Sequence, residues 1–216
     1  MSAVSDVWER EVLSRVLEYG MRGVDPVRHE VLAPVQGRVL ELGFGTGASL
    51  PHYGPGVTEL VAVEPAIQLA AIGRARLERF AAERSVPASL LTASATRPLG
   101  LDAGSFDTVV ILFVLCSIKH VDEALAQAHQ LLRPGGSLVL AEHVAAGTDT
   151  APERARGQVQ RLVSPAWKLA LAGCDPHKSL DGTLERHGFD VAGLEDRELG
   201  LPWVVRSGLV GSAVRR

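Results

Sequence analysis

Apolar residues near the start of the chain recur at helical spacing. This pattern predicts an amphipathic helix over about residues 5–21. A second, shorter helix is predicted to start with Asp25 as N-cap and Pro26 as its first helical residue, and to end near residue 33. We expect these two segments to form an N-terminal helical cap over residues 1–36.

From residue 37 onward, short apolar runs alternate with longer amphipathic segments. Strands are predicted at residues 38–42, 59–63, 89–92, 106–113, 137–142, 189–195 and 203–210. Helices are predicted at residues 65–84 and 121–132. Because strands that alternate with helices indicate right-handed βαβ units, the expected fold is a doubly wound α/β sheet with helices on both faces.

The segment after the fifth predicted strand reads as a helical insertion. It covers residues 151–188, and we expect Pro165 and Pro176 to interrupt it, since proline breaks helices. No stretch of linker composition divides the chain, so residues 1–216 are expected to form a single domain.

A glycine-rich segment follows the first predicted strand. It runs from Glu41 to Gly47, and a helix is expected to begin after it. Glycine permits a tight turn and lets a ligand approach the backbone, and N–H groups at a helix start favour negative or polar ligand groups. Glu64 follows the second strand, 21 residues after Gly43. That spacing suits an acid that accepts hydrogen bonds from both ribose hydroxyls of an adenosine.

The glycine spacing alone leaves two cofactors open, because Gly43-x-Gly45-x-x-Ala48 also fits the dinucleotide fingerprint. Glu41 favours S-adenosylmethionine, since a carboxylate there can hold the amino-acid end of that cofactor but would repel a pyrophosphate. A short dehydrogenase would also need a Tyr-x-x-x-Lys pair, and neither tyrosine is followed by lysine at that distance. A nicotinamide-dependent oxidoreductase is therefore the least favoured alternative.

Several motifs, in this order, resemble the class I S-adenosylmethionine-dependent methyltransferases, in the type 11 branch that includes the quinone C-methyltransferases. They occupy residues 41–47, 64, 106–107 and 132–136. Residues 115–119, 142–146, 165–167 and 173–174 are similar to stretches of the alkyl-thiol S-methyltransferases of animal endoplasmic reticulum and their bacterial relatives. The resemblance implies a Rossmann-like sheet of seven strands, mostly parallel with the last strand antiparallel, and places the helical insertion on the substrate side.

The resemblance also implies a set of cofactor-binding residues at the ends of four strands. The glycine loop would surround the methionine end of S-adenosyl-L-methionine, Glu64 would bind the ribose, and the next two residues would lie beside the adenine. Ser94 stands where many relatives have an aspartate that reads the adenine amino group. The full set is Glu41, Gly43, Phe44, Gly45, Thr46, Gly47, Glu64, Pro65, Ala66, Ser94, Ala95, Leu112 and Phe113.

Two residues are candidates for the chemistry at the methyl group. Methyl transfer is an in-line displacement that mainly requires alignment and exclusion of water, and a thiol acceptor needs little help from a base. His143, at the end of the fifth predicted strand, is the candidate base, with a packed structural histidine as the alternative. Cys116 is the candidate to face the methyl group, with a small buried residue as the alternative. Trp167, Leu169 and Leu171 are candidates for an apolar acceptor pocket.

Composition and charge limit the partners. The 216 residues carry a net charge of −3, which gives no electrostatic attraction to nucleic acid or anionic lipid. The longest apolar run has eight residues, whereas a membrane span needs about 20, so no span or export signal is expected. Two distant cysteines and scattered histidines show no metal-ligand spacing, so we expect no metal and a cytoplasmic location. A close pair of Cys116 and Cys174 stays open.

These observations favour an enzyme that methylates a small, apolar acceptor, with a thiol as the first choice. Methyl transfer to a phospholipid, a quinone or another oxygen, nitrogen or carbon acceptor is the alternative. A second alternative is a module that binds S-adenosylmethionine without turnover.

Overall fold

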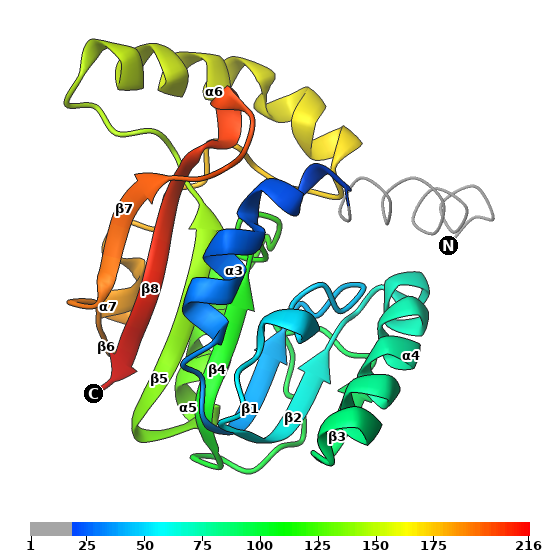
Figure 1. Cartoon of the computed structure of the whole chain (residues 1–216). Helices are drawn as coiled ribbons and strands as arrows, with labels where there is room; N and C mark the ends of the chain where they lie inside the picture. The colour runs from blue at the N-terminus through cyan, green and yellow to red at the C-terminus, as the bar shows by residue number, and fades with distance from the viewer. Residues whose placement is uncertain (1–18) are drawn as a thin grey trace.

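The computed structural model of the chain describes residues 19–216 (Figure 1). The helix expected over residues 5–21 lies almost wholly outside the described residues. A short turn, η2 (Arg22–Val24), leads into α3 (Asp25–Leu32). Asp25 is the first residue of α3 rather than its N-cap, because its carboxylate pairs with Arg28 at 2.6 Å instead of capping a backbone N–H.

The strands form one mixed sheet whose order is β3-β2-β1-β4-β5-β8-β6, with β7 also paired to β8. The strands are β1 (Gly37–Leu42), β2 (Val57–Val63), β3 (Ala88–Leu91), β4 (Phe106–Leu112), β5 (Leu132–His143), β6 (Phe189–Asp190), β7 (Leu194–Glu198) and β8 (Ser207–Arg215). The first five strands are parallel, and β8 runs antiparallel to β5. The predicted α/β class and the antiparallel last strand are therefore confirmed.

The sixth predicted strand is divided into β6 and β7, which pair with the same neighbour, β8. A turn separates them, in which the Leu194 N–H donates to the Val191 carbonyl and the Gly193 carbonyl accepts from Ser212. A Cβ atom on Gly211 would lie 2.2 Å from the Gly193 oxygen, so this turn requires glycine at position 211 of β8.

Helices cover both faces of the sheet, as the alternation of elements predicts. The helices are α4 (Ile67–Arg84), α5 (Val121–Leu131), α6 (Ala151–Ala170) and α7 (Thr183–Arg186). α3 and α4 bury their apolar residues in one core, and α5 and α7 bury theirs in a second core on the opposite face. Successive residues of β4 alternate between them, since Val110 belongs to the first core and Ile111 to the second.

The helical insertion differs from its prediction at Pro165, which lies inside α6 without ending it. Proline removes one backbone N–H, whose acceptor would be the carbonyl of Arg161. Both residues are exposed, so the loss falls on the solvent side of the helix rather than in the core. A Thr150–Glu153 capping box starts α6, and the chain turns at Ala172 and Gly173, both with positive φ. Pro176 lies in the irregular segment that follows.

α6 lies beyond the carboxyl ends of the parallel strands, at the top of Figure 1. Across residues 19–216, no helix combines the length and apolar character that crossing a bilayer requires.

Candidate functional site

The glycine loop between β1 and η3 (Leu50–His52) lies at the carboxyl edge of the sheet. Gly43, Gly45 and Gly47 have φ values of +78°, +58° and +81°, which side chains rarely adopt. A Cβ atom on Gly43 would lie 2.3 Å from the Val114 side chain, whereas one on Gly45 would meet no atom within 4 Å. The loop therefore packs closely against the β4 side and leaves its middle open.

The helix expected directly after this loop is absent from the described chain, and a single 3-10 turn, η3, takes its place. Pro51 lies in this turn, and Gly54, Pro55 and Gly56 follow within a few residues, so the segment cannot extend into an α-helix. Ligand-facing N–H groups at this edge must therefore come from the loop itself rather than from a helix start.

Phe44 lies between the first two loop glycines, but its side chain turns into the protein core. It is 3% exposed and packs against α4, where a Cβ atom on Gly73 would lie 2.9 Å from the ring. A cofactor contact at Phe44 would therefore involve its backbone rather than its side chain. Thr46 is also buried, although its carbonyl accepts a hydrogen bond from Arg76.

Glu64 follows β2 and is hydrogen-bonded to two backbone N–H groups. One carboxylate oxygen accepts from Gly45 at 2.8 Å and the other from Ala66 at 2.9 Å. The side chain therefore joins the glycine loop to the segment that precedes α4. Glu64 is buried and Pro65 beside it is exposed, which places both on the edge that the sequence predicts for the adenosine.

Glu41 lies at the end of β1 and is buried beneath the loop. Its Oε2 atom accepts hydrogen bonds from Ser49 Oγ at 2.8 Å and Tyr53 Oη at 2.9 Å. Burial raises the pKa of the Glu41 carboxyl to about 7, against the lowering effect of these two bonds and of the Arg28 charge. Sequence reasoning missed Ser49 and Tyr53, because the turn that brings them back to Glu41 has no periodic signal.

The residues predicted to read the adenine follow β3. Ser94 Oγ lies 2.9 Å from Thr96 Oγ1 and accepts a bond from the Thr96 N–H, so the hydroxyl is engaged locally. Ala95 is buried, and its carbonyl accepts from Gln127 at 2.7 Å. Both residues lie at the same sheet edge as Glu64, since β2 and β3 are parallel neighbours.

The end of β4 holds Leu112 and Phe113, which are both half-buried. Phe113 has φ of +59°, a left-handed conformation that costs a non-glycine residue about 1–2 kcal/mol. Its N–H donates to the Ala141 carbonyl at 2.8 Å, and the Arg28 guanidinium lies 5.7 Å from its ring. Such local strain is concentrated at functional sites, and the position of Phe113 next to the sulfonium stays a prediction.

Glu142 fixes the loop that follows Phe113. Its buried carboxylate accepts the N–H groups of Val114 at 2.5 Å, Leu115 at 2.8 Å and Cys116 at 3.3 Å. Burial raises the pKa of Glu142 to about 7, against the lowering effect of those N–H donors. Glu142 was not among the predicted site residues, although an acid at the otherwise apolar end of a buried strand was a signal for it.

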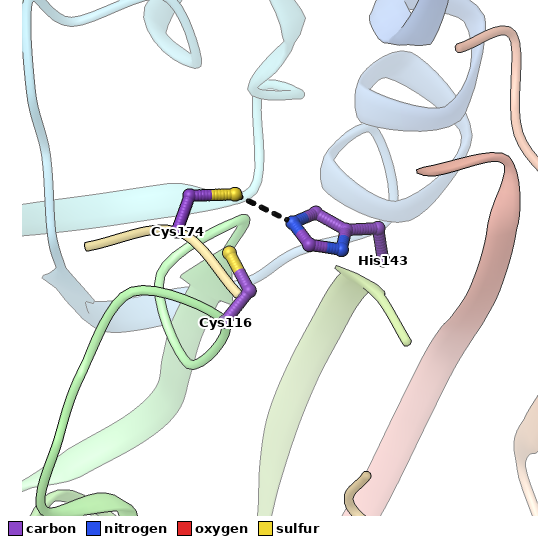
Figure 2. A group of neighbouring side chains, drawn as sticks. All are labelled: Cys116, His143 and Cys174. Atoms are coloured by element: carbon purple, nitrogen blue, oxygen red, sulfur yellow. Dashed lines mark hydrogen bonds between the residues drawn. The ribbon is translucent and has the colours of Figure 1, made fainter. Parts of the chain in front are cut away.

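Cys116, His143 and Cys174 converge from three separate segments (Figure 2). His143 Nε2 lies 3.0 Å from Cys174 Sγ, and one ligand-type atom from each of the three residues lies within 4.8 Å of the others. Cys116 and His143 are buried, and the Nδ1 atom of His143 has no hydrogen-bond partner among the described residues. The structure thus joins both residues of the catalytic prediction and answers the open question about the cysteine pair.

The electrostatics of this cluster shift the pKa values of its two thiols in opposite directions. The hydrogen bond with Cys116 lowers the pKa of the Cys174 thiol to about 5, and His143 lowers it further against the effect of burial. The hydrogen bond to Cys174 and burial raise the pKa of Cys116 well above its ordinary value. Burial alone would lower the pKa of His143, but the bond and charge of Cys174 raise it. Cys174 therefore carries the more acidic thiol of the pair.

The expectation of no metal-ligand set rested on spacing along the chain, and the fold brings together donors that the spacing separates. The three residues come from the loop after β4, the end of β5 and the turn after α6. The Asp175 N–H donates to the Cys116 carbonyl at 2.9 Å, which ties the first and third of these segments. Pairing between such distant segments is invisible in the sequence.

The three candidates for an apolar acceptor pocket differ in their burial. Trp167 packs against the first core, and Leu171 is half-buried. Leu169 is 89% exposed on the outer side of α6, so its predicted place in a pocket is wrong. The helix turns once every 3.6 residues, which directs neighbouring apolar residues to different sides.

Two cavities of the described residues lie away from the glycine loop. One, of about 620 Å³, opens at the amino ends of β1, β4 and β5, where Gly37, Asp107 and Arg133 line it. The other, of about 740 Å³, lies between the residues after β5 and β7, where Arg156 and Glu198 line it. Neither cavity includes the glycine loop. The candidate site is therefore defined by its residues, which are the glycine loop and the carboxyl ends of β1 to β5.

Comparison with known proteins shows the family to which the chain is related. A family model described as a methyltransferase domain matches residues 10–194. Human thiol S-methyltransferase TMT1A is 31% identical over 179 residues, which cover 82% of this chain and 70% of that protein. A phosphatidylethanolamine N-methyltransferase from Cereibacter sphaeroides is 31% identical over 109 residues, or 50% of this chain and 52% of that protein.

Solved structures support the same assignment at the level of the fold. A S-adenosylmethionine-dependent methyltransferase from Thermotoga maritima, described as a possible histamine N-methyltransferase, has a TM-score of 0.62 and 18% identity. The match covers 97% of this chain and 98% of that one. With the family match over most of its length, the chain belongs to the class I methyltransferases that use S-adenosyl-L-methionine as cofactor.

Proposed function

We propose that this methyltransferase transfers the methyl group of S-adenosyl-L-methionine to the sulfur of a small, apolar thiol. The observation that carries the proposal is the state of the acids at the site edge. Glu41, Glu64 and Glu142 each accept hydrogen bonds from protein donors, so each carboxylate has a structural task. An alcohol acceptor requires a strong general base, whereas a thiol with a pKa near ~8.5 does not.

The acceptor sulfur is placed beside Cys116 and His143, at the ends of neighbouring strands β4 and β5. This part of the edge offers sulfur and imidazole rather than carboxylate. Two of the relatives, from human and rat, are named thiol S-methyltransferases and align with 82% of this chain, which supports a thiol as acceptor.

The cofactor is placed along the ends of β1 to β4. Gly43 to Gly47 surround its methionine part, and Glu64, already fixed by two N–H donors, accepts from the ribose hydroxyls. Pro65, Ala66, Ser94 and Ala95 lie on the adenine side, and Leu112 and Phe113 adjoin the sulfonium. Glu41 supplies negative charge for the ammonium group of the methionine part.

The reaction is a single displacement. The thiolate sulfur forms a bond to the methyl carbon while the bond between that carbon and the sulfonium sulfur breaks, and the electron pair stays on the cofactor. The products are a methyl thioether and S-adenosyl-L-homocysteine. The protein aligns the two sulfur atoms with the methyl carbon and excludes water, which in favourable cases lowers the barrier by ~7–11 kcal/mol.

A methyl-labelled cofactor tests the acceptor. We expect labelled thioether from alkyl thiols, and no labelled product from phosphatidylethanolamine vesicles or from a demethylated quinone. Label transferred only to the amine or the quinone would overturn the thiol assignment. Tight cofactor binding without transfer to any of the three would equally contradict it.

The substitution Gly45→Ala tests the cofactor site with a matched control. A Cβ atom on Gly45 meets nothing within 4 Å, so alanine adds the strain of a positive φ but no clash within the protein, and the atom enters the space assigned to the cofactor. We expect at least about 10-fold weaker cofactor binding in calorimetry. Gly135 has a similar φ of +72° and equally open surroundings at the opposite sheet edge, so Gly135→Ala should leave binding unchanged. Equal effects of both changes would contradict the placement.

A further inference from the structure

We propose that Cys116, His143 and Cys174 bind a Zn²⁺ ion whose fourth position holds the acceptor thiol as a thiolate. The inference rests on the proposed function for the identity of the acceptor, but the metal site stands on its own geometry. Sequence spacing gave no indication of it.

The donor set is the one that zinc prefers. Two cysteine sulfurs and one imidazole nitrogen are typical ligands of this borderline-soft ion. Neighbouring ligand atoms of a tetrahedral zinc site lie roughly 3.5–3.8 Å apart, given the usual bond lengths. In this structure Cys174 Sγ and His143 Nε2 are 3.0 Å apart and all three donor atoms lie within 4.8 Å. Changes of roughly 1 Å or less in the separations of the donor atoms would therefore accommodate the ion.

Main-chain hydrogen bonds already hold the three segments together. The Asp175 N–H donates to the Cys116 carbonyl at 2.9 Å, and the Ala145 N–H donates to the Lys178 carbonyl at 2.7 Å. The Glu142 carboxylate fixes the backbone at Cys116 from the other side. Because the ligands are positioned by backbone contacts, the site needs little rearrangement to bind an ion.

The set contains three donors, which is the number found in catalytic zinc sites. Among the histidine, cysteine and acidic side chains of residues 19–216, these three lie close enough together to share an ion. The carboxylate nearest in sequence, Glu142, is committed to three backbone N–H groups. Structural zinc sites have four protein ligands, whereas three leave a position for water or substrate.

The site adjoins the place assigned to the sulfonium. β1, β4 and β5 are neighbours in the sheet, so the glycine loop, Phe113 and His143 follow adjacent strand ends. The Val114 side chain lies against Gly43, and Cys116 follows two residues later. A thiolate held by the cluster therefore lies at the edge where the methyl group is expected.

The chemistry balances without any change of oxidation state. Zn²⁺ takes the place of the protons that the cluster holds, namely the Cys116 thiol proton and the proton between Cys174 Sγ and His143 Nε2, and those protons pass to water. The acceptor thiol then binds the ion and releases its own proton to water. Its sulfur forms the bond to the methyl carbon as the bond to the sulfonium sulfur breaks. The neutral thioether is a weaker zinc ligand than a thiolate, so it leaves the ion.

Cobalt reports on such a site because four-coordinate Co²⁺ with thiolate ligands is strongly coloured. The full chain, stripped of metal and reduced with a phosphine, should bind about one Co²⁺ with thiolate charge-transfer and visible d–d bands, and Zn²⁺ should displace it. C116S, C174S and H143Q should each weaken Co²⁺ binding by more than about 100-fold, since loss of even an outer partner costs 10–100-fold. His120 is exposed and outside the cluster, so H120Q should bind Co²⁺ normally.

Two further readouts separate the outcomes. An added alkyl thiol should change the Co²⁺ spectrum as it enters the fourth position; an unchanged spectrum would overturn the role in holding the acceptor. Absence of the bands, or equal binding by all four variants, would overturn the metal site, as would a Cys116–Cys174 disulfide that persists after reduction. Cofactor binding is measured on the same metal-free samples: if it survives, the methyltransferase assignment stands although the zinc inference fails.

Discussion

The buried carboxylate of Glu41 predicts that cofactor affinity rises with pH below neutrality. Burial raises its pKa to about 7, so in the free protein the group is mostly protonated at pH 6. The cofactor brings an ammonium group, which favours the carboxylate. Binding at pH 6 must therefore expel a proton from Glu41, and this requirement weakens binding.

The magnitude follows from the fraction ionised. With a pKa of about 7, Glu41 is roughly one-tenth ionised at pH 6 and half ionised at pH 7. If the ionised form binds, affinity rises about fivefold over this unit of pH, or ~1 kcal/mol. The α-amino group of the cofactor, with a reference pKa near ~7.8, stays largely charged over the same interval. The change in affinity therefore comes from Glu41 rather than from the cofactor.

Calorimetry in buffers of different ionisation enthalpy measures both quantities. Wild type should release close to one proton for each cofactor bound at pH 6, and about half a proton at pH 7. Glu41→Gln keeps the volume and the hydrogen-bond acceptor for Ser49 and Tyr53. Its affinity should be independent of pH and its proton release near zero. A pH-independent wild type, or a glutamine variant with the wild-type slope, would refute the reasoning.

The raised pKa of Glu41 also predicts how the stability of the protein changes with pH. A carboxyl group whose pKa is raised on folding stabilises the native state below its unfolded value of 4.5, and this contribution is lost as pH rises through about 7. The free energy of unfolding of the cofactor-free protein should therefore fall over that interval, less steeply in Glu41→Gln. Denaturant titration at several pH values measures it, and a variant as steep as wild type would disagree.

Three further predictions concern stability. Gly43→Ala combines a φ of +78° with a Cβ atom 2.3 Å from Val114, so urea unfolding should show a loss of about 2–4 kcal/mol; a loss below ~1 kcal/mol would contradict the packing. Glu142→Ala leaves three N–H donors without their acceptor and should cost at least about 3 kcal/mol, with an unchanged Tm as the opposing result. Ser85→Gly relieves a left-handed residue at the end of α4, and a stabilisation of about 0.5–1 kcal/mol is expected; any destabilisation would be contrary.

The sheet and its helices were predictable because their apolar periods are regular. Strands such as β2 and β4 are continuous runs buried on both faces, and α5 ends where Arg133-Pro134-Gly135 cannot continue a helix. The glycine loop and Glu64 were found because a turn followed by an acid at fixed spacing is a local pattern. Their placement at one edge then follows from parallel strand pairing.

The rest depended on contacts between distant segments. The turn after Gly47 failed to become a helix because Pro51 and the glycines after it outweigh local propensity. The proline in α6 was tolerated because it and Arg161, whose carbonyl loses its donor, lie on the exposed side of the helix. The meeting of Cys116 with Cys174 is set by a turn after α6, and no periodic pattern encodes where such a turn folds back.

β8, the last strand of the chain, lies directly beside Glu142 and His143 of β5. In its pairing with β5, Glu142 stands opposite Leu209 and His143 opposite Gly208, and adjacent strand residues point to opposite faces. Sliding β5 by a single position against β8 would exchange these two directions, so that the imidazole took the place of the acid that anchors the neighbouring loop. The alignment of one antiparallel strand pair therefore decides which of two consecutive side chains anchors the loop after β4 and which joins the cluster with Cys116 and Cys174.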